Sequence, residues 1–286
     1  MTKILVTGSK GQLGSELQKL AGNYPGYRFL FTDIDELDIT DASAVRCFFE
    51  RERPEVVINC AAYTAVDQAE DHEDTARLLN AEAAGSLAAA SGACDALMVH
   101  ISTDYVFSGN AERPMTEEDD PDPVSVYGRT KLEGEKAVAA NATRAVIIRT
   151  SWLYSSFGNN FVKTILRYGR ERGTLNVVDD QTGTPTYARD LAEAILNLLP
   201  EMRDIRRAEI FNYSNEGITT WYDFALEIIA VKGIRCTVNP ILTKEYPTRA
   251  PRPAYSVLSK EKIKQRFGIT IQDWRVSLKE CLKKID

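Results

Sequence analysis

The feature that most constrains the fold is a glycine loop directly after the first apolar segment. Residues 3–7 form a predicted strand, Gly8, Gly11 and Gly14 follow it, and leucines then recur at helical spacing. Glycines let a backbone turn tightly and approach a pyrophosphate, whose charge is met by free N–H groups and the helix dipole. This order of elements predicts a dinucleotide site, with a ligand-free glycine turn as the alternative.

The rest of the first half alternates short β-branched runs with helical patterns, which is typical of a parallel sheet covered by helices. Further strands are predicted at 28–32, 56–60, 97–102 and 145–150, and helices at 80–94 and 125–141. After about residue 152 this rhythm loosens, and residues 246–253 are predicted to be an irregular loop. We expect an α/β chain: a Rossmann-type doubly wound sheet over 1–151, to which some later segments return, and a smaller α/β substrate-binding part over 152–286.

Composition excludes several classes of protein. The 286 residues are 44% hydrophobic and 27% charged, which is ordinary for a globular chain. Lys+Arg 35 against Asp+Glu 41 gives a net charge of −6, which argues against nucleic acid as a partner. Five scattered cysteines without a C-x-x-C motif indicate neither disulfides nor a thiolate metal site. Without a signal peptide or a run of about eighteen apolar residues, we expect a cytoplasmic protein with no membrane partner.

An acidic residue lies where a dinucleotide site needs one. Asp33 follows Gly14 by nineteen residues, at the end of the second predicted strand. A carboxylate there accepts hydrogen bonds from the adenosine ribose diol. It would repel a 2′-phosphate, which favours NADH, but Lys10 in the glycine loop could offset that repulsion for NADPH. Both cofactors therefore stay open.

A second motif, Y-x-x-x-K, is formed by Tyr127 and Lys131. On a helix these side chains lie one turn apart, and an ammonium beside a phenol is expected to lower the phenol pKa from about 10. The motif is weak alone, because it recurs by chance on many helices. Thr103, flanked by Ser102 and Asp104, follows a predicted strand, where open α/β sheets bind ligands.

Glycine loop, hydroxyl and Y-x-x-x-K occur in the order of the short-chain dehydrogenase/reductase family, whose extended branch this chain resembles. More specific blocks resemble the dTDP-4-dehydrorhamnose reductases. These blocks cover residues 61–70, 102–109, 149–154, 158–161 and 180–186, together with Arg252 and Pro253, Ser256 and Leu258.

The resemblance implies an NADH- or NADPH-dependent oxidoreductase that reduces the 4-keto group of dTDP-4-dehydro-L-rhamnose, in the last step of dTDP-L-rhamnose synthesis. It implies that Tyr127 donates the proton, Lys131 tunes it and holds the nicotinamide ribose, and Thr103 orients the carbonyl. The implied cofactor set also contains Gly8, Gly11, Gln12, Leu13, Gly14, Asp33, Asp38, Ile39, Ala62, Tyr63 and Thr64. The implied substrate set is Thr103, Asp104, Trp152 and Arg252, the last toward the diphosphate.

Other interpretations stay open at this point. A sugar-nucleotide epimerase or dehydratase shares the fold, but dehydratases carry a second carboxylate where this chain has Tyr105. The reductases also resemble the non-catalytic regulatory subunit of methionine adenosyltransferase, which uses the fold as a binding module.

Several single residues have structural interpretations as well. Trp152 could be core filler, Asp104 a local cap and Arg252 a solvated charge. His100 is predicted to be a packed core residue, and Glu16 a solvated helix charge, so no metal site is predicted. Oligomeric state is not readable from the sequence, and a homodimer is compatible with it.

Overall fold

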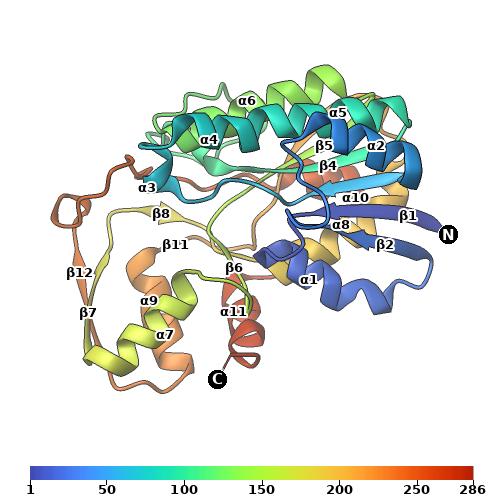
Figure 1. The fold of residues 1–286 in the computed structure, drawn as a ribbon. Helices are drawn as coiled ribbons and strands as arrows, with labels where there is room; N and C mark the ends of the chain where they lie inside the picture. The colour runs from blue at the N-terminus through green and yellow to red at the C-terminus, as the bar shows by residue number, and fades with distance from the viewer. Residues whose placement is uncertain (286) are drawn as a thin grey trace.

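A computed structural model describes residues 1–285. Its centre is a parallel six-stranded sheet in the order β10-β5-β4-β3-β1-β2 (Figure 1). The strands are β1 (Thr2–Thr7), β2 (Tyr27–Phe31), β3 (Val56–Asn59), β4 (Leu97–Thr103), β5 (Arg144–Thr150) and β10 (Ala208–Asn212). The predicted doubly wound sheet is confirmed, and β10 extends it from the second half of the chain.

Helices cover both faces of this sheet (Figure 1). One face carries α1 (Gln12–Leu20) and α8 (Ala188–Met202), and the other carries α2 (Ala42–Glu52), α5 (Ala83–Ala93) and α6 (Val126–Asn141). Because both faces are buried, the strands read as continuous apolar runs.

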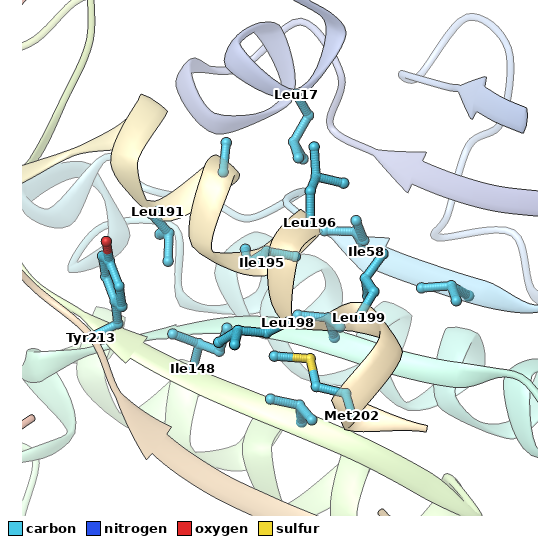
Figure 2. Close-up of a cluster of buried hydrophobic side chains, with 14 of the residues drawn as sticks. Leu17, Ile58, Ile148, Leu191, Ile195, Leu196, Leu198, Leu199, Met202 and Tyr213 are labelled. Atoms are coloured by element: carbon cyan, nitrogen blue, oxygen red, sulfur yellow. The ribbon is translucent and has the colours of Figure 1, made fainter. Parts of the chain in front are cut away.

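Alternate strand residues supply the two cores. Ile4 and Val6 pack with the leucines of α1 and α8, whereas Leu5 packs on the opposite face. Figure 2 shows the first core, where Leu17 of α1 and Leu196 of α8 approach Ile58 of β3. The alternation follows from the period of two in a strand.

The smaller part of the chain lies beyond the carboxyl edge of the sheet (Figure 1). It holds α7 (Phe161–Arg172), α9 (Trp221–Val231) and α11 (Trp274–Leu282), which share a core around Phe224. It also contains three two-stranded sheets: β6 (Leu153–Tyr154) with β9 (Thr186–Tyr187), β7 (Thr174–Val178) with β12 (Thr237–Ile241), and β8 (Thr182–Gly183) with β11 (Thr219–Thr220).

The other elements are short: η1 (Ala21–Asn23), α3 (Val66–Ala69), α4 (Glu73–Arg77), η2 (Leu78–Glu82), η3 (Asp104–Val106), η4 (Thr243–Glu245) and α10 (Glu261–Phe267). Residues 246–253 contain neither helix nor strand, as predicted. Within residues 1–285, no helix is both long and apolar enough to cross a bilayer.

The strand order also sets where a ligand can bind. From β1 the chain moves outward to β2, then returns past β1 to β3 on its other side. Such a reversal leaves a crevice outside the carboxyl ends of the strands. Here that crevice lies between the sheet and the smaller part.

Candidate active site

A cleft of about 940 Å³ opens at this crevice. It is lined by the carboxyl ends of β1, β3, β4 and β5 and by residues of α7 and α9. Its volume lies within the range of about 300–1,000 Å³ that is usual for ligand sites. Fifteen of the predicted site residues line it: Gly8, Gly11, Gln12, Leu13, Gly14, Asp33, Asp38, Ile39, Ala62, Thr64, Thr103, Asp104, Tyr127, Lys131 and Trp152.

Two predicted site residues are not among the lining residues. Tyr63 is held through its backbone, because its N–H donates to Asn80 Oδ1 at 2.8 Å. Arg252 lies on the irregular loop and its Nη2 donates to Asp67 Oδ2 at 2.6 Å. Arg252 is therefore engaged with α3 in this structure rather than solvated.

Neighbouring backbone segments pack closely against the glycines of the loop, where only a residue without a side chain fits. Gly8 has φ of +64°, and a Cβ on it would lie 2.6 Å from Ala61 N. A Cβ on Gly14 would lie 2.4 Å from the carbonyl oxygen of Gly8. No side chain caps the N-terminus of α1, which leaves its first N–H groups available to an anion. These features fit the pyrophosphate of a dinucleotide.

Helix α6 presents the Y-x-x-x-K pair. Ser125 caps this helix by accepting a hydrogen bond from Gly128 N at 3.1 Å, which places the helix start just before Tyr127. Lys131 is buried, and its Nζ donates to the carbonyl oxygen of Ile101 at 2.6 Å. Burial lowers the pKa of Lys131 to about 8, although Glu135 and Cys60 act in the opposite direction.

The expected lowering of the tyrosine pKa is wrong for this structure. Burial raises the pKa of Tyr127 to about 12, and the charge of Asp104 adds to the rise while Thr103 opposes it. Desolvation disfavours the phenolate, and Lys131 bonds to the backbone instead of the phenol. Tyr127 therefore carries its proton throughout the neutral range.

Thr103 and Asp104 stand together at the end of β4. Thr103 Oγ1 donates to Asp104 Oδ1 at 3.0 Å and accepts from Tyr105 N at 3.2 Å. Burial raises the pKa of Asp104 to about 7. Asp104 lines the cleft, and its carboxylate also accepts hydrogen bonds from the backbone N–H groups of Asp104 and Tyr105, as a local cap does.

Comparison with known proteins shows which protein family this chain resembles. The family model described as RmlD substrate binding domain matches residues 1–286. A dTDP-4-dehydrorhamnose reductase of Aggregatibacter actinomycetemcomitans is 40% identical, over 98% of each chain. The chain belongs to the dTDP-4-dehydrorhamnose reductase family.

Solved structures agree with that membership. A dTDP-4-dehydrorhamnose reductase from Clostridium acetobutylicum ATCC 824 is 46% identical, covers 99% of both chains and superposes with a TM-score of 0.94. Another from Bacillus anthracis, in complex with NADP, is 37% identical and also has a TM-score of 0.94, covering 99% of this chain and 100% of the other.

A buried ion pair connects α6, which carries Tyr127 and Lys131, to β5 of the sheet. Glu135 lies one turn after Lys131, and its carboxylate binds Arg149 through Nε at 2.9 Å and Nη2 at 2.7 Å. Ser102 Oγ donates to the same carboxylate at 2.5 Å. The pair joins α6 to β5, and Ser102 adds β4. Sequence patterning did not find it because the partners lie on different elements that only the fold brings together.

Two tryptophans form one wall of the cleft. Trp152 has φ of +47°, a strained conformation for a bulky residue, and is half-buried. Its ring stacks on Trp221 at 3.5 Å between centroids and 8° between planes. Trp152 is thus a lining residue and not core filler. Trp221 lies at the start of α9 and was not among the predicted site residues.

Two further residues had structural predictions. His100 is buried, as predicted, with Nδ1 3.1 Å from Asn59 Nδ2. Glu16 was predicted to be a solvated helix charge, and that is wrong: it is 1% exposed and accepts from Ser155 Oγ at 2.6 Å. The smaller part covers this side of α1, which the local pattern of α1 does not reveal. No cluster of three or more metal-ligating side chains occurs within residues 1–285.

Proposed function

We propose that this chain uses NADH or NADPH to reduce the 4-keto group of dTDP-4-dehydro-L-rhamnose, giving dTDP-L-rhamnose. The observation that carries the proposal is the convergence of the glycine cradle, Thr103 and the Tyr127–Lys131 pair on one cleft. Relatives named for this activity match nearly the whole chain.

The residues present fit a reduced nicotinamide dinucleotide. The glycine loop and the start of α1 would hold the pyrophosphate, with Asp33, Asp38 and Ile39 around the adenosine. Lys131 would hold the nicotinamide ribose, and Ala62 and Thr64 would border the cofactor. When bound, the cofactor supplies the hydride that the sugar C4 receives.

The protein contributes positioning and the proton. Thr103 orients the 4-keto oxygen, and Tyr127 Oη donates its proton to that oxygen as negative charge develops on it. The charge of Lys131 stabilises the phenolate that results. Residues after 151 would form the substrate wall, with Trp152 beside the sugar nucleotide and Arg252 toward the diphosphate.

The test is substrate-dependent loss of the absorbance of the reduced nicotinamide. We expect loss with dTDP-4-dehydro-L-rhamnose and formation of dTDP-L-rhamnose in equal amount. Cofactor binding without any turnover would contradict the reductase assignment and favour the regulatory module. Conversion of the sugar nucleotide without net consumption of cofactor would indicate an epimerase or a dehydratase.

The rate of sugar reduction should also fall at alkaline pH. Lys131 has a pKa of about 8, so it is charged below this pH and loses its charge as the pH rises. Glu135 of the same helix faces Lys131, as do Cys60, which follows β3, and His100 of β4. We therefore expect kcat/KM for reduction to be higher below pH 8 and to decline above it.

A pH profile of kcat/KM, with Asp104→Asn as the control, checks this expectation. Asp104 has the other cited pKa near neutrality, at about 7. If Lys131 governs the decline, the control keeps it at the same pH. A decline that vanishes in Asp104→Asn would assign the titration to the aspartate instead.

A further inference from the structure

The adenosine end of the cleft holds its acidic residue in a defined position. Lys10 N donates to Asp33 Oδ2 at 2.9 Å, and Ile34 N donates to Asp33 Oδ1 at 3.0 Å. A carboxylate offers about four acceptor sites, so Asp33 can still accept from both ribose hydroxyls. Its charge is equally placed to repel a phosphate on the 2′-oxygen.

Lys10, the cation that could offset this repulsion, is already engaged. Its Nζ lies 2.5 Å from Asp35 Oδ2 and 4.0 Å from Glu36 Oε1. The hydrogen bond with Asp35 raises the pKa of Lys10 and lowers that of Asp35, so both groups stay charged near neutrality. The ammonium is thus directed to carboxylates beside the cleft.

The described lining of the cleft offers a 2′-phosphate few cations. Among residues 1–285, Lys10 and Lys131 are the only cations that line the cleft, and Lys131 lies beside Tyr127 at the catalytic end. The segment from 33 to 38 carries four carboxylates: Asp33, Asp35, Glu36 and Asp38. The local charge is therefore negative where NADPH would add a phosphate dianion.

We propose that this chain selects NADH over NADPH, and that Asp35 determines this selectivity by holding Lys10, with Glu36 in support. The inference rests on the proposed function, because it assumes that the cleft binds a reduced nicotinamide dinucleotide. It goes beyond the proposed function because it states which of the two cofactors binds more tightly and which residues determine that preference.

Binding in the absence of sugar nucleotide tests the selectivity separately from turnover. Titration of the wild-type protein by nicotinamide fluorescence should show NADH binding about 10- to 100-fold tighter than NADPH, the scale set by one close like-charge contact near a protein surface. In the double variant Asp35→Asn/Glu36→Gln, Lys10 is released toward the 2′-phosphate. The affinity ratio should then move toward NADPH by about tenfold.

Two controls separate the local effect from net charge. Glu50→Gln removes a carboxylate from the exposed face of α2 and should leave the ratio unchanged. Adding Lys10→Met to the double variant should abolish the shift toward NADPH, because the cation that causes it is gone.

The outcomes distinguish this inference from the proposed function. Equal wild-type affinities, or a double variant with an unchanged ratio, would overturn the selectivity while leaving the reductase assignment intact. Selective NADH binding without sugar turnover would support the selectivity and contradict the proposed reaction. Binding of neither cofactor would overturn both.

Discussion

Tyr127→Phe is expected to lower kcat for sugar reduction about 100- to 10,000-fold, the usual contribution of a positioned general acid. The variant removes the hydroxyl that we propose as the proton donor, and Thr103 cannot replace it because its hydroxyl is a much weaker acid. Cofactor affinity should stay near that of the wild type, since the ring keeps its edge contact with Tyr105 at 5.5 Å. Steady-state turnover and cofactor titration measure the two effects.

The matched control is Tyr213→Phe. Tyr213 is buried in the core between the sheet and α8 and does not line the cleft (Figure 2). The substitution removes the same phenolic hydroxyl as Tyr127→Phe does. The turnover of the Tyr213→Phe variant should stay close to the wild-type value. Wild-type turnover in Tyr127→Phe would show that another group protonates the sugar oxygen.

Glu135→Gln is expected to lower the free energy of unfolding by about 3–5 kcal/mol, as removal of one partner from a buried ion pair does. Glu135 and Arg149 are 3% and 2% exposed. Arg149 Nη1 already has no hydrogen-bond partner within residues 1–285, so the variant leaves the guanidinium buried without its counter-charge. Urea unfolding of the wild type and the variant measures the difference.

Replacing both partners provides the decisive comparison. The double variant Glu135→Leu/Arg149→Met should recover most of the lost stability, because no charge then stays buried. The surface variant Glu280→Gln, which removes an exposed partner of Lys283, should change stability little. If Glu135→Gln were as stable as the wild type, the pair would not join α6 to the sheet as described.

The sequence by itself determined the elements whose signals are local. The strand, glycine loop and helix at 3–20 and the helix that carries Tyr127 and Lys131 occur as predicted. Glycine spacing, a capping serine and apolar periodicity act over a few residues, so they can be read without knowing the fold. The parallel sheet then brings strand ends together, which explains why most predicted site residues share one cleft.

Only the tertiary structure decided the environment of each group. The burial of Glu16, the raised pKa of Tyr127, the Glu135–Arg149 pair and the capture of Lys10 by Asp35 all depend on neighbours from separate segments. Desolvation and charge pairing act through space at distances of a few ångströms, and residues that close can lie far apart in the chain. Local patterns supply the residues of such a site, and the packing of the elements sets their charge, proton affinity and partners.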